Sequence, residues 1–380
     1  MVMILVGGTG APLNDRIAFI HVLRGVAPLM VLWAHLGGWW LAANHRTSRL
    51  QDLWINIVDK PFHLYQDGGH LGVLIFFLVS GFVITHVSLR ETKTEFAIKR
   101  AFRLLPPLWL AFAAVAVLSA VAARLGLPPI LGPLSDDYIS SLTLWNWIVG
   151  KPGVLSVVWT LWIEIMFYTL TGLLIGVSRS RPVLATWLMI AIPLLGNMAM
   201  QEFPFLVPLM FGLMYIPFLL VGRSVYLAWS GRVAVGPAVC VGISSYAVFA
   251  LVYNNLLPGY LFQQGNEVII SHAIALIAFL SLCFSGIQRV PRAVAFCADI
   301  SYSLYLLHAP LGSFFIYILV AARLPYEGAL PIAVAGVMAV CWGIYVFIER
   351  PSQRLGRTVT LSLVRGTTVP IPGVAREIAG

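Results

Sequence analysis

The chain alternates between long apolar runs and short polar segments over most of its length. A helix rises about 1.5 Å per residue, so roughly 20 apolar residues cross the hydrocarbon core of a bilayer. Ten runs approach that length, and they lie near residues 17–42, 70–89, 97–123, 156–178, 182–199, 204–222, 235–256, 268–288, 300–321 and 329–349. The pattern predicts an all-α integral membrane protein, built as a bundle of about ten transmembrane helices.

The segments outside these runs divide the chain into three parts. Residues 1–16 have a short apolar run with no basic region before it, so we expect a cytoplasmic leader rather than a cleavable signal peptide. Residues 17–349 form the predicted membrane domain, and the polar residues 350–380 a cytoplasmic tail. Two connections, 43–69 and 124–155, are long and contain polar and aromatic side chains. Such loops either carry binding function or simply pack over the bundle.

Composition agrees with a membrane protein. The chain is 59% hydrophobic and only 10% charged, with a mean hydropathy of +0.89, whereas soluble domains carry about 25% charged residues. The four cysteines form no CxxC pair and lie in or beside apolar segments. The sequence therefore predicts neither disulfides nor a metal site.

The basic residues orient the predicted helices. If the N-terminus is cytoplasmic, 18 of the 24 Lys and Arg residues fall on the cytoplasmic side and 6 on the outer side. This bias follows the positive-inside rule and predicts that both termini are cytoplasmic. It also accounts for much of the net charge of +9 without a nucleic acid as partner. In this arrangement Arg223 is a cytoplasmic anchor that follows the sixth span.

Ionisable residues inside the predicted spans are the first candidates for chemistry. Arg24 and His35 are eleven residues apart, about three helical turns, so they share a face and lie roughly 16 Å apart along the axis. The spacing suits a molecule whose anionic end meets Arg24 and whose reactive end reaches His35. Glu164 and His308 lie at a similar depth in two other spans, which predicts one polar cavity. Ordinary hydrogen bonds between helices are the competing interpretation.

Two further pairs of residues share a helix face. Arg100 and Arg103 open the third span and, together with Arg24, are suited to clamp phosphate groups. They are alternatively ordinary positive-inside anchors. Tyr302 and Tyr305 lie three residues apart in the ninth span. They either hydrogen-bond a ligand or belong to the interfacial aromatic belt.

In register, these motifs resemble the acyltransferase-3 family of multi-pass membrane acyltransferases over nearly the whole chain. The matching segments are Arg24 to His35, GGHLGVLIFFLVSGF, Arg100 to Arg103, WTLWIEIMFY with Glu164 and Tyr168, SYSLYLLH ending at His308, and Glu349-Arg350-Pro351. We expect a stand-alone member, without the SGNH hydrolase-like domain that some members append.

The resemblance implies transfer of an acyl group, usually acetyl, from cytoplasmic acyl-CoA to a hydroxyl group of a carbohydrate. The expected acceptor is a surface polysaccharide, a lipid-linked glycan or a glycosylated small molecule, and the expected location is a bacterial inner membrane. Acyl-CoA is a co-substrate, and no permanently bound cofactor is expected. The rival interpretation is a transporter or flippase for lipid-linked sugars. The oligomeric state stays open.

Each candidate residue has a hypothetical role in this reaction. His35 is the general base or, as an alternative, a transient acyl carrier. Glu164 orients the imidazole or binds the acceptor. The phosphates of CoA are assigned to Arg24, Arg100 and Arg103. The predicted substrate-binding residues are Tyr168, Tyr302, Tyr305 and His308, of which Tyr302 and His308 are alternatively placed to stabilise the developing oxyanion.

Overall fold

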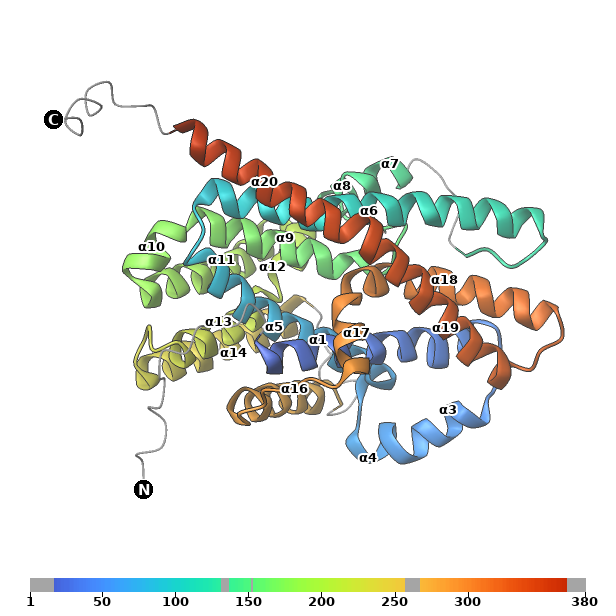
Figure 1. Cartoon of the computed structure of the whole chain (residues 1–380). Helices are drawn as coiled ribbons and strands as arrows, with labels where there is room; N and C mark the ends of the chain where they lie inside the picture. Colours follow the sequence, from blue (N-terminus) through green and yellow to red (C-terminus); the bar gives the residue numbers. More distant parts are fainter. Residues whose placement is uncertain (1–16, 131–136, 152, 257–266, 368–380) are drawn as a thin grey trace.

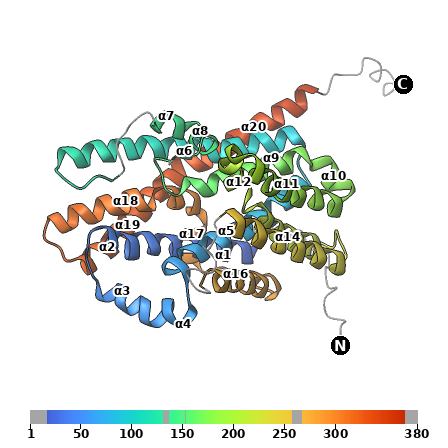
Figure 2. The ribbon, with the colours of Figure 1, turned by 180° about the vertical axis from the view of Figure 1, so that it is seen from behind.

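A computed structural model describes residues 17–130, 137–151, 153–256 and 267–367, and within these ranges the chain forms helices and turns without strands. The axes of most long helices are roughly aligned and the helices lie side by side, while α20 crosses α6 obliquely (Figure 1). The view from behind shows the same bundle (Figure 2). The longer helices are α1 (Ala18–Trp33), α5 (Gly69–Ser88), α6 (Lys93–Arg124), α9 (Val158–Leu173), α11 (Pro182–Glu202), α13 (Ile216–Trp229), α14 (Val235–Leu256), α16 (Glu267–Phe284), α18 (Ser301–Ala321), α19 (Tyr326–Ile344) and α20 (Arg350–Thr367).

Shorter helices connect or extend these elements. They are α2 (Trp40–Ala43), α3 (Arg49–Trp54), α4 (Lys60–Phe62), α7 (Asp137–Leu142), α8 (Trp145–Ile148), α10 (Ile175–Ser180), α12 (Val207–Leu213) and α17 (Arg292–Asp299), with π or 3-10 turns at η1 (Ala34–Trp39), η2 (Ile55–Asp59), η3 (Tyr65–Gly68), η4 (Pro204–Leu206) and η5 (Tyr345–Glu349). The predicted long connection 43–69 is therefore largely helical. Residues 1–16, which are the whole predicted leader, and residues 368–380, which are part of the predicted tail, lie outside the described residues.

The predicted membrane bundle is confirmed. Within the described ranges, nine helical segments are long and apolar enough to cross a membrane. The run predicted at 156–178 is instead two helices. Helix α9 has only 16 residues, and the helical backbone is interrupted at Leu174 before α10 begins. At the C-terminal end of the membrane domain, α19 continues through η5 into α20. The chain therefore stays helical beyond residue 349, the predicted end of the domain.

Helix α5 occupies the centre of the bundle, where it packs against α1, α13, α16 and α9. Its closest neighbour is α13, and two glycines permit the approach. A Cβ atom on Gly81 would lie 1.8 Å from the backbone oxygen of Leu219, and one on Gly222 would lie 2.1 Å from that of Leu78. Small residues of this kind let membrane helices pack backbone to backbone.

The position predicted for Arg223 is wrong. The residue lies inside α13 rather than in a loop beyond it, and its side chain is fully buried. The guanidinium group donates hydrogen bonds to Thr186 Oγ1 at 2.9 Å and to Ser178 Oγ at 3.2 Å. The span is longer than its apolar run, because hydroxyl groups of neighbouring helices solvate an arginine that the hydropathy pattern places at the boundary.

Candidate active site

The two histidines predicted from different spans lie next to each other. His308 Nε2 lies 3.1 Å from His35 Nδ1, and the ring centroids are 4.8 Å apart. His35 lies in η1, a π-helical turn that interrupts the first membrane helix, and such turns occur often at functional sites. His308 lies in α18 and is fully buried. The tertiary structure thus joins residues that are 273 positions apart in the sequence.

The hydrogen-bond network assigns the ring protons of this pair. His308 Nδ1 lies 2.9 Å from the backbone oxygens of Leu304 and Tyr305, which only accept hydrogen bonds. In neutral His308 the Nδ1 atom therefore carries the proton, and Nε2 is an acceptor. His35 Nδ1–H then donates to His308 Nε2 and to the Val31 oxygen, 2.9 Å away. This leaves His35 Nε2 as the unprotonated nitrogen, which is the atom that a general base needs.

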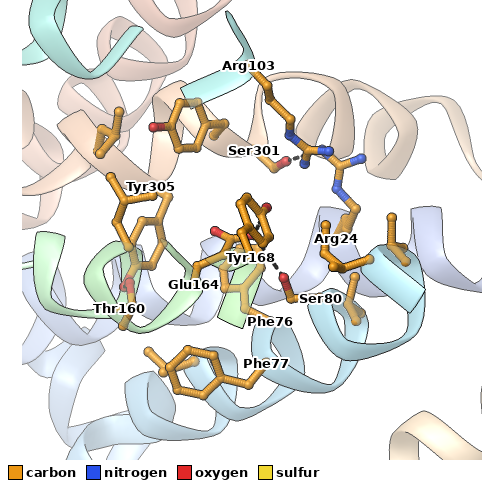
Figure 3. A pocket seen from close by; sticks show the side chains of 17 residues that line it. Arg24, Phe76, Phe77, Ser80, Arg103, Thr160, Glu164, Tyr168, Ser301 and Tyr305 are labelled. Carbon is orange, nitrogen blue, oxygen red and sulfur yellow. Dashed lines mark hydrogen bonds between the residues drawn. The ribbon is translucent and has the colours of Figure 1, made fainter. Parts of the chain in front are cut away.

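Glu164 lies in a separate small cavity of about 100 Å³ between α1, α5, α9 and α18 (Figure 3). Its carboxylate accepts hydrogen bonds from Ser80 Oγ at 2.8 Å and from the Tyr168 hydroxyl. Within the described chain, the imidazole partner of His35 is His308 rather than Glu164. Glu164 forms no hydrogen bond with His35 among the described residues, and its predicted role in binding the acceptor stays a prediction.

The other predicted tyrosines also line this cavity. The Tyr302 hydroxyl donates to the Leu104 backbone oxygen at 2.9 Å, which ties α18 to α6. The Tyr305 hydroxyl accepts a hydrogen bond from Thr160 Oγ1 at 2.8 Å. Phe76 packs edge-on against the Tyr305 ring. Tyr302 and Tyr305 thus combine a wall position with contacts between helices.

The three predicted arginines surround a second, larger cavity of about 480 Å³. Arg24 donates to Ser301 Oγ at 3.0 Å. In Figure 3 the guanidinium groups of Arg24 and Arg103 lie beside each other. Arg100 has two buried nitrogen atoms, Nε and Nη1, without a hydrogen-bond partner among the described residues. Clustered like charges and unpaired donors are costly unless an anion binds between them.

The two cavities share Arg24, Arg103 and Val83 in their walls. They therefore adjoin at the pair of guanidinium groups, with the basic cavity on one side and the chamber that contains Glu164 on the other. A long molecule with an anionic head fits this arrangement, because the head meets the arginines and the tail enters the mostly apolar chamber. We refer to the larger cavity as the vestibule and to the smaller one as the chamber.

The histidine pair lies beyond the far wall of the chamber. Neither His35 nor His308 lines it, whereas Tyr305 does, and the Tyr305 ring centroid lies 6.2 Å from that of His308. The sequence predicted one cavity for His35, Glu164 and His308. The structure instead places Glu164 in the chamber wall and the histidine pair outside that wall, with Tyr305 in the wall and near His308.

Several polar residues of the site had no predicted role. Ser80, Thr160 and Ser301 supply hydroxyl groups within the motifs that carry the family resemblance, but a single serine or threonine in an apolar run gives no separate signal. Glu349 is 97% buried, and its carboxylate accepts hydrogen bonds from the backbone nitrogen and the hydroxyl of Ser303. It therefore caps the positive N-terminus of α18.

The described residues form a multi-pass membrane protein with two adjoining cavities between its helices. Residues 17–349 match the sequence profile of the acyltransferase-3 family, described as an acyltransferase domain. The chain therefore belongs to this family, and the protein is an acyltransferase.

Two curated proteins are similar to this chain in sequence. The chain is 29% identical over 334 residues to the exopolysaccharide production protein ExoZ of Rhizobium meliloti (strain 1021), which covers 83% of this chain and 99% of that protein. It is 28% identical over 196 residues to nodulation protein 10 of Rhizobium leguminosarum bv. viciae, covering 48% of this chain and 50% of that protein. No solved structure matches the chain.

Proposed function

We propose that the protein transfers an acetyl group from cytoplasmic acetyl-CoA to a hydroxyl group of a surface polysaccharide or its lipid-linked precursor, in a bacterial inner membrane. The observation that carries the proposal is the junction of vestibule and chamber at Arg24 and Arg103. A CoA thioester has a phosphorylated head and a long, mostly uncharged arm that ends at the acyl group. That order of groups matches the order of basic vestibule, apolar chamber and histidine pair.

The donor is held at its phosphates. Arg100 and Arg103 project from one face of α6, and Arg24 faces them from α1. Planar guanidinium groups bind phosphate with two parallel hydrogen bonds, which suits a diphosphate. Helix α5 contributes more residues to the chamber wall than any other helix, and its apolar side chains, such as Val73, Phe76 and Val79, suit the arm of the donor.

The chemistry takes place at His35. Nε2 removes the proton from the acceptor hydroxyl while the oxygen attacks the thioester carbonyl. The new carbon–oxygen bond replaces the carbon–sulfur bond, and the thiolate leaves and receives the proton from His35. His308 holds the imidazole in the required tautomer through the 3.1 Å contact. Tyr305 lies in the chamber wall near His308, so in this scheme its side chain moves when the acyl group passes from the chamber to the histidine pair.

The acceptor is proposed from similarity. ExoZ, a relative along nearly its whole length, is named for exopolysaccharide production. A glycan hydroxyl needs a general base for attack on a thioester, and His35 Nε2 supplies one. The half-buried ring of His35 lies 4.8 Å from the exposed ring of Trp39, which offers a sugar an aromatic surface beside the base.

The test combines two measurements. Purified protein in detergent or nanodiscs is mixed with acetyl-CoA and a glycan fraction, and free CoA thiol is followed over time. In parallel, surface glycans of cells that carry wild-type protein, His35→Ala or no protein are analysed by mass spectrometry. We expect thiol release and an added acetyl mass with wild type alone.

The matched control is His45→Ala, which removes an exposed histidine outside the first span and should leave both signals unchanged. Equal glycans in all strains together with no thiol release would overturn the proposal. A transporter of lipid-linked sugars would give that result. Normal acetylation by His35→Ala would retain the transferase but remove His35 from the mechanism.

A further inference from the structure

Helix α20 lies beyond the residues that match the family profile, yet it is fixed to the membrane domain. Ser352 donates a hydrogen bond to the backbone oxygen of Phe102 on α6. One turn further, Gly356 is buried against the same residue, and a Cβ atom there would lie 2.8 Å from Phe102 Cβ. These contacts hold α20 against the helix that carries Arg100 and Arg103.

One face of α20 lines the vestibule. Gln353 and Arg357 are four residues apart, so they share a face, and both belong to the vestibule wall together with Arg90 and Arg100. Arg354 and Arg357 are both exposed, but only Arg357 lines the cavity. The side chains of α20 therefore divide into a cavity face and a solvent face.

The vestibule holds more positive charge than one diphosphate requires. Besides Arg24 and Arg103 at the inner end, Arg90, Arg100 and Arg357 contribute to its wall. The carboxylate in the same wall, Glu91, forms an ion pair with Lys99 at 3.1 Å. The buried Nε and Nη1 atoms of Arg100, which have no hydrogen-bond partner among the described residues, are available to donate to an anion. A second anionic group, further from the chamber, would satisfy the outer arginines.

We propose that α20 forms the outer wall of the donor site and that Arg357, assisted by Gln353, binds the phosphate on the ribose of CoA. The inference rests on the proposed function. The thioester of CoA must point into the chamber, so the nucleotide at the opposite end of the molecule lies in the vestibule. Its ribose phosphate is the anionic group furthest from the thioester, and Arg357 contributes a cation from outside the matched domain.

Direct binding tests this assignment without requiring turnover. Full-length protein is purified as wild type, Arg357→Ala and Arg354→Ala, and the dissociation constants of CoA and 3′-dephospho-CoA are measured by isothermal titration calorimetry. For Arg357→Ala we expect CoA to bind about tenfold more weakly and 3′-dephospho-CoA to bind as in wild type, since one charge-assisted contact is lost. Arg354→Ala should bind both ligands like wild type.

A second variant checks the placement of the helix. Gly356→Leu should push α20 from Phe102 and weaken CoA binding in the same selective manner, while Arg357→Lys should retain part of the affinity. Equal affinities of wild type and Arg357→Ala for CoA would overturn the inference, and so would an equal loss for both ligands. If wild type binds CoA with this selectivity but releases no thiol with any acceptor, the inference stands and the proposed function fails.

Discussion

His308 Nε2 lies 3.1 Å from His35 Nδ1, and the backbone carbonyls behind His308 determine which ring carries the proton between them. The arrangement makes His308 a positioning residue for His35 in the proposed reaction. It resembles a common solution in enzymes, where a second group holds a histidine in the tautomer that a base requires. Replacing His308 should therefore change the turnover number rather than the affinity for the substrate.

Replacing His308 tests this relationship. We expect His308→Ala to lower kcat about 10–100-fold with an unchanged KM for acetyl-CoA, because general-base catalysis contributes roughly 10²–10⁴-fold and the base loses its orienting partner. His308→Gln should recover part of the rate, since an amide oxygen still accepts from His35 Nδ1–H. Steady-state kinetics of thiol release measures both. An increase in KM with constant kcat would assign His308 to substrate binding instead.

Replacing Arg103, at the inner end of the vestibule, should weaken the binding of acetyl-CoA. Arg103→Ala should raise the KM for acetyl-CoA about tenfold and change kcat little, because a phosphate contact is present in both the ground state and the transition state. Arg103 suits the test better than Arg24, which also joins α1 to Ser301. Arg124→Ala is the matched control, since Arg124 is exposed at the far end of the same helix. Equal KM values for both variants would contradict the phosphate clamp.

The hydrogen bond between Thr160 and Tyr305 predicts a change in the course of the reaction. Tyr305→Phe keeps the ring but removes the hydroxyl oxygen that accepts from Thr160 at 2.8 Å. We expect more hydrolysis of acetyl-CoA relative to transfer, by about two- to tenfold, because the wall between chamber and histidine pair then opens more readily to water. The measurement is the ratio of thiol release to acetylated glycan.

Tyr317→Phe controls for the loss of a hydroxyl elsewhere on α18. Tyr317 accepts a hydrogen bond from Asn44 and does not line the chamber. If both variants keep the wild-type ratio, Tyr305 has no gating role in the reaction.

Glu349 predicts an effect on stability. Glu349→Ala removes the carboxylate that accepts two hydrogen bonds from Ser303, and it leaves a buried helix N-terminus uncapped. We expect a loss of about 1–3 kcal/mol in the free energy of unfolding, and a smaller loss for Glu349→Gln, whose amide oxygen still accepts. Denaturant unfolding in detergent measures the difference. The exposed Glu202→Ala should change stability by less than about 0.5 kcal/mol, and a similar loss there would argue against the cap.

The crossing of α5 and α13 predicts a steric effect. Gly81→Ala would place a methyl group 1.8 Å from the Leu219 oxygen, so the helices must separate. We expect a destabilisation of about 1–3 kcal/mol, as for other overpacked interiors. Gly176→Ala has open space around the new methyl group and should be neutral or slightly stabilising. Comparable melting temperatures for the two variants would show that the crossing tolerates the extra atom.

The apolar runs determined the membrane class and nearly all the membrane-spanning helices, because a span must be long, apolar and helical regardless of its neighbours. The deviations occur where neighbours matter. Helix α13 continues past Arg223, which lies inside the bundle because hydroxyl groups from other helices accept its hydrogen bonds. The break at Leu174 and the π turn that carries His35 have no signature in a hydropathy pattern, since both depend on local backbone geometry.

The sequence by itself also indicated which ionisable residues enter the membrane, and it predicted a phosphate clamp of Arg24, Arg100 and Arg103, which line one cavity in the structure. Only the tertiary structure decided their partners. Depth along a helix is readable from the number of residues, but the rotation and contact of helices depend on packing between distant segments. For that reason the sequence left open that His35 contacts His308 rather than Glu164, that Tyr305 lines the chamber near His308, and that α20 lines the vestibule.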